Sequence, residues 1–293
     1  MLGWAFMDDT QTEILAPPTL AVLTIAGSDS GGGAGIQADL RTFSAYGLLG
    51  TTAITAITAQ NTVGVDAWEP VSARLVAAQI AAILRDLPVK AAKTGMLGTV
   101  DIIEAVSASL DSAAPDLPLV VDPVMISTSG HRLLRAEAEE ALVRVLIPRA
   151  LVLTPNLPEA AALSGLSESA SATEHAARIR LFAPRAWIVV KGGHGNANNN
   201  NDLCVDAVFA PDGTHFEIKL PRVPTRNTHG TGCTLSAAIA AKLALGATAE
   251  DAIRSARRFV QRGLEAASPI GAGHGPLNHL FAMTAGIDAV RSL

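Results

Sequence analysis

The chain has 293 residues, of which 49% are hydrophobic and 17% are charged, so it can fill a large core and is not intrinsically disordered. Its formal net charge is −5 and lysine and arginine form no run, which argues against nucleic acid as a partner. Two cysteines, Cys204 and Cys233, make no disulfide framework and fit a reducing compartment. We therefore expect a cytoplasmic protein.

The N-terminal region is acidic rather than basic. Asp8, Asp9 and Glu13 lie within it, and it has no basic start of the kind that begins a secretory signal peptide. Charges also interrupt every apolar run before it reaches the roughly 18 residues that a membrane span needs. We expect residues 1–19 to form a flexible arm, residues 20–293 to form a single domain, and no membrane partner.

After residue 20, apolar segments with strand-like and helical spacing alternate. We expect strands at Leu20–Ala26, Thr51–Ala59, Val89–Lys93, Leu119–Val121, Leu151–Leu153 and Ala186–Val190, and helices at Ala34–Tyr46, Arg74–Leu87 and Val100–Leu110. This alternation predicts an α/β fold with a central, mostly parallel sheet and helices on both faces. In such folds ligands bind beyond the carboxyl ends of the strands.

The pattern changes near residue 202. Leu203–Phe209 and His215–Leu220 flank the turn sequence Pro211-Asp212-Gly213, which predicts a β-hairpin. The preceding segment, Gly195–Asp202, is polar and of low complexity, and we expect a mobile loop there.

A glycine-rich turn, residues 27–35, follows the first expected strand. It lacks the dinucleotide fingerprint, because Ile36 stands three positions after Gly33, and the chain has no Gly-Lys pair for a Walker loop. Two interpretations stay open. The segment is either a tight strand–helix turn or a place where a small ligand approaches the backbone, with Asp39 one helical turn further on.

A second pair of glycines precedes a helix that we expect from Thr234 onward. Glycines at this place let backbone N–H groups converge on an anion, and the helix dipole adds positive charge, so Gly230-Thr231-Gly232 could hold phosphate. A thiol at a helix N-terminus has a pKa lowered from about 8.5, so Cys233 could act as a base toward a substrate hydroxyl. The alternative is a buried, inert cysteine behind a glycine turn.

Polar residues at other strand ends also allow two interpretations each. Asn156 and Glu159 match a helix capping box, yet Glu159 could also help to hold a hydrated Mg²⁺. Asp122 is a second candidate for that ion, or a turn residue before proline. Lys191 is either a solvated turn residue or a group aimed at the same edge. Gln60 ends a strand in a polar turn, or its amide binds the edge of an aminopyrimidine.

Together these segments resemble the hydroxymethylpyrimidine/phosphomethylpyrimidine kinases of thiamine biosynthesis, which belong to the ribokinase-like superfamily. The resemblance runs in family order over about residues 20–280 and rests on Thr24-Ile25-Ala26-Gly27-Ser28-Asp29, Gly35-Ile36-Gln37-Ala38-Asp39-Leu40, Ala59-Gln60-Asn61-Thr62, Lys93-Thr94-Gly95-Met96-Leu97, Asp122-Pro123-Val124-Met125, Thr154-Pro155-Asn156-Leu157-Pro158-Glu159-Ala160, Val190-Lys191-Gly192-Gly193-His194 and Asn227-Thr228-His229-Gly230-Thr231-Gly232-Cys233-Thr234. Residues 1–19 lie outside it, Ser30 stands where relatives often have proline, and the asparagine-rich segment 196–201 is unusual.

The resemblance implies a three-layer α/β/α fold, commonly dimeric, that uses ATP and Mg²⁺. The implied reaction is phosphorylation of 4-amino-5-hydroxymethyl-2-methylpyrimidine, and then of its monophosphate. By family analogy the pyrimidine pocket is lined by Gly27, Asp39, Gln60 and Met96. Asn156 and Glu159 would organise Mg²⁺ and phosphates with Asp122 nearby, Lys191 would approach ATP, and Gly230, Thr231 and Gly232 would form an anion hole beside Cys233. The cysteine stands where many sugar kinases of the superfamily carry an aspartate base.

Two other functions remain open from the sequence. A pyridoxine or pyridoxal kinase of the same fold would also phosphorylate a hydroxymethyl group on a flat heteroaromatic ring. A non-catalytic pyrimidine-binding protein would keep the fold but would not need the phosphate-binding groups. Consumption of ATP that depends on added pyrimidine would exclude a non-catalytic binding protein. The relative kcat/KM for pyrimidine and pyridine substrates would distinguish a pyrimidine kinase from a pyridoxine or pyridoxal kinase.

Overall fold

The computed structural model describes residues 19–125, 136–192 and 202–293, and within them the strands form one sheet. Its spatial order is β3-β2-β1-β4-β5-β6-β7-β8-β9. The bounds are β1 (Ala21–Ser28), β2 (Leu49–Gln60), β3 (Val65–Pro70), β4 (Val89–Thr94), β5 (Leu119–Val121), β6 (Val152–Leu153), β7 (Trp187–Val190), β8 (Leu203–Phe209) and β9 (His215–Pro221). Strands β2, β1, β4, β5, β6 and β7 pair in parallel, whereas β3, β8 and β9 join antiparallel. The mostly parallel sheet is confirmed.

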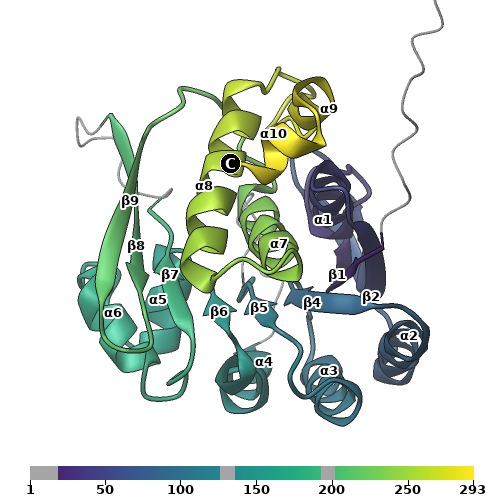
Figure 1. Cartoon of the computed structure of the whole chain (residues 1–293). Helices are drawn as coiled ribbons and strands as arrows, with labels where there is room; N and C mark the ends of the chain where they lie inside the picture. The colour runs from purple at the N-terminus through teal and green to yellow at the C-terminus, as the bar shows by residue number, and fades with distance from the viewer. Residues whose placement is uncertain (1–18, 126–135, 193–201) are drawn as a thin grey trace, which may run out of the picture.

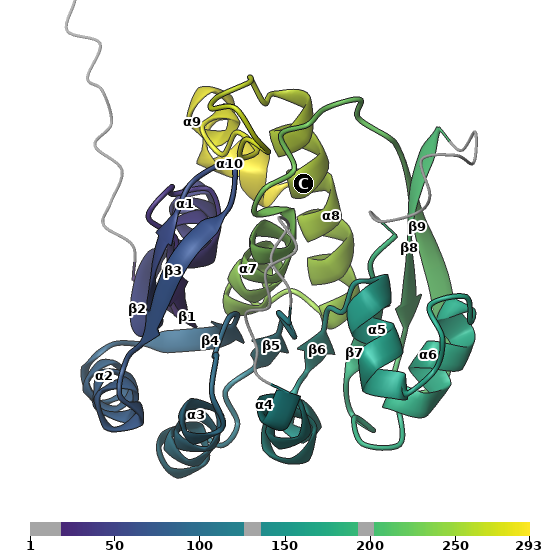
Figure 2. The ribbon, with the colours of Figure 1, turned by 180° about the vertical axis from the view of Figure 1, so that it is seen from behind.

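Helices cover both faces of this sheet (Figures 1 and 2). One layer contains α1 (Gly35–Ala45), α7 (Thr231–Ala244), α8 (Ala249–Glu265), α9 (Phe281–Ala285) and α10 (Ile287–Arg291). The other contains α2 (Ala73–Asp86), α3 (Val100–Ala113), α4 (Ala136–Ala141), α5 (Leu157–Ser164) and α6 (Ala172–Ile179). Separate apolar clusters fill the space on each side of the sheet, so the expected three-layer α/β/α fold is confirmed.

Every strand and helix that the spacing predicts exists within a few residues of its expected bounds, with one notable shift. Helix α7 begins at Thr231, three residues before the expected Thr234, because Gly230 with φ 81° turns the chain into the helix. The sequence did not single out β3, an exposed edge strand, or the charged helix α8. Residues 1–18 and the expected loop Gly195–Asp202, apart from Asp202, lie outside the described residues.

The expected hairpin joins β8 and β9. The residues opposite each other run from Leu203 with Pro221 to Phe209 with His215. Its turn includes Gly213 at φ 89°, a left-handed conformation that glycine adopts without strain. The hairpin extends the sheet beyond β7, so β8 faces α8 at the end of the molecule farthest from β3 (Figure 1).

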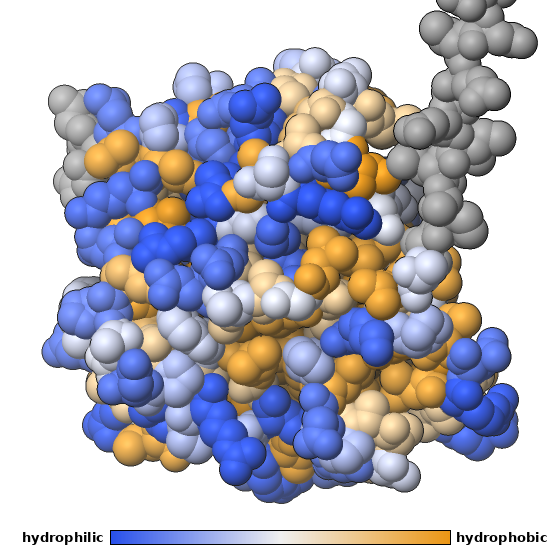
Figure 3. Space-filling view, in the orientation of Figure 1, coloured by the Kyte–Doolittle hydropathy of each residue, from blue (hydrophilic) through white to orange (hydrophobic). Residues whose placement is uncertain are grey.

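Polar and apolar residues are interspersed on the face of the molecule shown in Figure 3. Large exposed apolar side chains come from separate elements, among them Leu75 of α2, Leu203 of β8 and Met283 of α9. Scattered residues of this kind are ordinary on a protein surface and identify no partner. None of the described helices combines the length and the apolar character needed to cross a membrane.

Candidate active site

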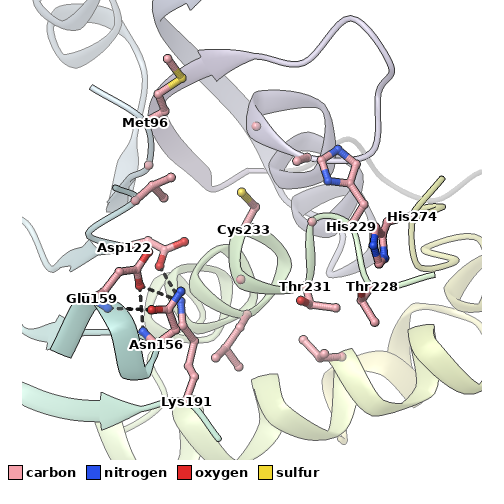
Figure 4. Close-up of a pocket in the computed structure, with 18 of the residues that line it drawn as sticks. Met96, Asp122, Asn156, Glu159, Lys191, Thr228, His229, Thr231, Cys233 and His274 are labelled. Carbon is pink, nitrogen blue, oxygen red and sulfur yellow. Dashed lines mark hydrogen bonds and ion pairs between the residues drawn. The ribbon is translucent and has the colours of Figure 1, made fainter. Parts of the chain in front are cut away.

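A cavity of about 820 Å³ opens beyond the carboxyl ends of the parallel strands. This is the edge at which doubly wound sheets bind ligands. All of the residues singled out in the sequence line it, except Asp39, and they come from seven separate segments: Gly27, Gln60, Met96, Asp122, Asn156 with Glu159, Lys191, and Gly230 to Cys233. Figure 4 shows Cys233 between Met96 on one side and the group formed by Asp122, Glu159 and Lys191 on the other.

The N-terminus of α7 faces this cavity. Gly230 packs so closely on the glycine-rich turn that a Cβ on it would lie 2.0 Å from the carbonyl oxygen of Gly33. A Cβ on Gly232 would lie 3.3 Å from Lys191 Nζ and 3.6 Å from Asp122 Oδ2. The first N–H groups of a helix have no acceptor within the helix. In α7 these include the N–H groups of Gly232 and Cys233, which line the cavity beside the ammonium of Lys191, an arrangement that suits an anion.

The sequence predicts a lowered pKa for the Cys233 thiol, but in the structure this pKa is raised. Burial raises its pKa to about 11, and the carboxylates of Asp39 and Asp122 act in the same direction. Lys93 and the N–H of Gly35 lower the pKa of the thiol but do not outweigh the loss of water. At neutral pH the unliganded protein therefore holds Cys233 as the thiol.

An ion cluster lies at the ends of β5 and β7. Lys191 Nζ donates to Asp122 Oδ1 at 3.0 Å and lies 3.7 Å from Glu159 Oε2. Thr154 Oγ1 donates to the same Asp122 oxygen at 3.0 Å. Burial alone would lower the pKa of Lys191, but the two carboxylates raise it above its ordinary value. The cluster thus contains a permanently charged lysine that can face a phosphate.

Asn156 and Glu159 do form the capping box of α5. The Asn156 side chain accepts from the Glu159 N–H, and the Glu159 carboxylate accepts from the Asn156 N–H, both at 2.8 Å. The cap does not exclude a role at the site, since both residues line the cavity. Burial raises the pKa of Glu159 to about 7, although Lys191 opposes the shift. Glu159 therefore changes charge near neutral pH.

The opposite end of the cavity is narrow and largely apolar. A Cβ on Gly27 would lie 3.2 Å from the sulfur of Met96, so a larger residue there would crowd the Met96 side chain. Met96 packs with Ala56, Trp68 and Val124. Such a wall suits one face of a flat heteroaromatic ring.

The resemblance implies that Asp39 lines the pyrimidine pocket, but in the structure Asp39 does not line the cavity. It is fully buried beneath the cavity floor, where Lys93 Nζ donates to both of its carboxylate oxygens at 2.9 and 2.8 Å. Thr24 Oγ1 donates to Oδ2 at 2.6 Å. The physical reason is the direction of α1, which turns this side chain toward β1 and β4 rather than toward the strand ends.

Sequence reasoning missed the pair formed by Asp29 and His229. His229 Nε2 lies 2.8 Å from Asp29 Oδ2, although 200 positions separate the two residues. Asp29 also accepts from the N–H groups of Gly31, Gly33 and Ala34 and so holds the glycine-rich turn. The signal was present, because each residue lies inside a glycine motif, but spacing along the chain does not show that the two motifs meet.

A second lobe of the cavity, between the hairpin and α8, was also missed. It is lined by Asp206 of β8 and Arg257 of α8, whose Nε donates to Asp206 Oδ2 at 2.7 Å. Asp206 Oδ1 accepts from the N–H of Gly192 at 2.8 Å and so fixes the turn that follows Lys191. The cavity therefore extends from the Met96 wall, past Cys233, to α8.

Comparison with solved structures identifies the class of fold. The ADP complex of pyridoxal kinase from Bacillus subtilis is similar to the chain with a TM-score of 0.81 and 36% identity, over 92% of this chain and 100% of that one. Phosphomethylpyrimidine kinase from Clostridium difficile gives a TM-score of 0.69 and 39% identity, over 83% and 98% of the two chains. The fold is that of the ribokinase-like kinases.

The chain belongs to the phosphomethylpyrimidine kinase family, whose pattern matches residues 29–278. Among its relatives, the hydroxymethylpyrimidine/phosphomethylpyrimidine kinase of Haemophilus influenzae is 46% identical over 259 residues, which cover 88% of this chain and 96% of that protein. The corresponding kinase of Rhizobium meliloti is 47% identical over 266 residues, covering 89% and 97%.

Proposed function

We propose that this protein transfers the γ-phosphoryl group of ATP to the hydroxymethyl group of 4-amino-5-hydroxymethyl-2-methylpyrimidine, and a second phosphoryl group to the resulting monophosphate. The names of its relatives support the activity. The observation that carries the proposal is the meeting of the α7 N-terminus with Lys191 beside Cys233. Phosphoryl transfer depends mainly on such positioning and charge neutralisation.

In the proposed step, the substrate hydroxyl oxygen bonds to the γ-phosphorus while the bond from that phosphorus to the bridging oxygen breaks, releasing ADP. The N–H groups of Gly232 and Cys233 and the ammonium of Lys191 stabilise the transferring phosphoryl group. The hydroxyl proton passes to the thiolate of Cys233. Because burial keeps this thiol protonated at neutral pH, only a small fraction of the protein is active as a base at any instant.

The side chains near Lys191 fit Mg²⁺. Asp122 and Glu159 offer carboxylate oxygens on the cavity wall and Asn156 an amide oxygen, which are the ligands this ion prefers. Within the described residues no group of three acidic, histidine or cysteine side chains is arranged to hold a metal without help. This suits an ion held mostly by water and phosphate oxygens, which would neutralise charge on the nucleotide.

Phosphorylation of pyridoxal is a second candidate function. It is favoured by the similarity to the Bacillus subtilis pyridoxal kinase, which exceeds 0.8 in TM-score over nearly the whole chain. The wall formed by Met96 and Gly27 accepts either flat ring. Gln60, at the same end of the cavity, distinguishes them, because a carboxamide pairs with the ring nitrogen and amino group of an aminopyrimidine.

Phosphorus NMR tests both candidates directly. Purified protein is incubated with ATP, Mg²⁺ and the hydroxymethylpyrimidine, and pyridoxal and pyridoxine are tested in parallel. Successive monophosphate and diphosphate signals from the pyrimidine support the main proposal. Product from the pyridine substrates alone would move the assignment to pyridoxal phosphorylation, and the absence of ADP with every substrate would contradict both.

A further inference from the structure

The carboxamide of Gln60 lies between two polar side chains at the cavity wall. Its terminal nitrogen is placed 3.3 Å from His229 Nε2, and its oxygen 3.3 Å from Thr58 Oγ1. The nitrogen and oxygen of a carboxamide have nearly the same shape, so their hydrogen-bond partners decide which is which. The hydrogen bonds that His229 and Thr58 make to other groups therefore determine which way the Gln60 amide is turned.

His229 Nε2 is an N–H group and not an acceptor toward Gln60. Burial alone would raise the pKa of Asp29, but hydrogen bonds from His229 and from the backbone bring it below its usual value, so Asp29 is a carboxylate. A carboxylate only accepts, and it lies 2.8 Å from His229 Nε2. That nitrogen consequently carries hydrogen and cannot accept from an amide N–H. The Gln60 atom beside it has to be the oxygen.

The hydrogen bonds of Thr58 lead independently to the same orientation of the Gln60 carboxamide. Its hydroxyl donates to the carbonyl oxygen of Ser28 at 2.9 Å, which uses its single proton. Toward Gln60 the hydroxyl oxygen can then only accept, so the atom facing it has to be the NH₂ group. Turning the carboxamide by 180° gives a hydrogen bond from its NH₂ group to Thr58 Oγ1, and places its oxygen rather than its NH₂ group beside the His229 N–H that Asp29 accepts.

We propose that Asp29, His229 and Thr58 lock the Gln60 carboxamide with its carbonyl toward His229 and its NH₂ toward Thr58, and that this lock makes the site select a 4-amino ring over the corresponding 4-oxo ring. The inference rests on the proposed function. After the locking bonds are made, Gln60 has one carbonyl lone pair and one N–H left. They match an amino group and the adjacent ring nitrogen of an aminopyrimidine.

A 4-oxo ring reverses this pattern, since its ring nitrogen carries hydrogen and its carbonyl accepts. Against the locked amide it makes two contacts between like groups, each of which leaves a polar group unpaired. An amide that could turn freely would bind both rings. The lock, rather than Gln60 alone, is therefore the element that discriminates.

The same lock orients the reacting group. In the aminopyrimidine the carbon bearing the hydroxymethyl group adjoins the carbon bearing the amino group, on the side away from the ring nitrogen. An amino group beside the Gln60 carbonyl lies on the His229 side. The hydroxymethyl group then points toward the loop that leads from His229 into α7 and Cys233 (Figure 4).

The test compares kcat/KM for 4-amino-5-hydroxymethyl-2-methylpyrimidine and for its 4-oxo counterpart. We expect the unsubstituted protein to prefer the amino ring by about 100-fold or more, since two mismatched polar contacts each cost more than tenfold. In the double variant His229→Phe/Thr58→Val the preference falls below about tenfold. Thr58→Ser, which retains the hydroxyl, keeps the original preference. Because the readout is a ratio of two substrates, a general loss of activity or stability does not change it.

Equal use of both rings by the unsubstituted protein, or an unchanged preference in the double variant, overturns the inference. If the variant does not fold, ¹⁵N NMR of the unsubstituted protein shows which nitrogen of His229 carries the proton. A proton on His229 Nε2 at pH 7 supports the lock, and a proton on Nδ1 alone contradicts it. Turnover of neither ring by the unsubstituted protein contradicts the proposed function instead, and the NMR result still decides the orientation of the amide.

Discussion

At the scale of single residues, Cys233 is subject to two opposing effects. The N-terminus of α7 favours a thiolate, and so do the ammonium of Lys93 and the N–H of Gly35. Burial and the nearby carboxylates favour the thiol, and they prevail. An aspartate in the same place would be ionised more readily, so a cysteine base gives activity that depends more strongly on pH.

Replacing Cys233 tests whether it accepts the proton. We expect Cys233→Ala to lower kcat by about 10²–10⁴-fold, the usual contribution of a general base, while most of the affinity for ATP remains. Steady-state kinetics with the pyrimidine substrate and a direct measurement of nucleotide binding check this.

The pH profile is the control for this substitution. If the thiolate is the base, kcat of the unsubstituted protein rises from pH 7 toward the thiol pKa of about 11, and Cys233→Ala loses this rise. An essentially unchanged kcat in the variant would remove Cys233 from the mechanism.

Glu159 links stability to pH. Its pKa of about 7 in the folded protein lies above the usual 4.5, so between these values the folded state holds a proton that the unfolded chain releases. The stabilisation is therefore complete below pH 4.5 and is lost as the pH rises through 7. Glu159→Gln keeps an acceptor for the Asn156 N–H but cannot ionise.

We expect the fall in free energy of unfolding between pH 5 and pH 8 to be smaller in Glu159→Gln than in the unsubstituted protein, by roughly 1–3 kcal/mol. Denaturant unfolding at the two pH values measures it. Parallel curves for the two proteins would show that Glu159 does not titrate in this range.

At the scale of elements, the start of α7 depends on one contact between two loops. Gly230 is in the left-handed region at φ 81°, and it also packs on the backbone of Gly33. Gly246, just after the same helix, has φ 86° but open space around it. The two glycines separate the cost of backbone conformation from the cost of a clash.

Gly246→Ala should destabilise the protein by about 1–2 kcal/mol, the cost of a left-handed alanine. Gly230→Ala should cost more than about 3 kcal/mol, because its methyl group cannot fit without separating α7 from the glycine-rich turn. Thermal unfolding of both variants gives the comparison. Equal losses would mean that the contact between Gly230 and Gly33 contributes nothing beyond its φ angle.

At the scale of the whole molecule, one sheet connects the two ends of the cavity. Helix α7 packs against β1, β4 and β5, and the cavity takes residues from β1 through to α8. The single domain expected over residues 20–293 stays a prediction, as do a homodimer and a cytoplasmic location.

We expect calorimetry to show one unfolding transition that moves as a whole when ADP is added. At a ligand concentration of 100 times Kd the stabilisation should be about 2.7 kcal/mol. Sedimentation of the same sample gives the oligomeric state. Two transitions, of which ADP shifts only one, would contradict a single domain.

Much of the fold followed from local patterns in the sequence. The buried strands Leu119–Val121 and Trp187–Val190 stand out because a strand covered on both faces is apolar throughout. The capping box of Asn156 and Glu159 was equally visible, since its two partners are three residues apart. The antiparallel edge strand Val65–Pro70 was not, because it is mostly exposed and its partner strand provides its register.

By itself, the sequence determined the order of strands and helices, the glycine turns at their ends and, through resemblance, the family. The tertiary structure alone decided that Asp29 and His229 meet, that Asp39 is buried against Lys93, and that the Cys233 thiol is protonated rather than ionised. Turns and periodicity depend on neighbours along the chain. Pairing and desolvation depend on groups that the fold brings together from distant positions, and it is these that fix the charge of each group in the site.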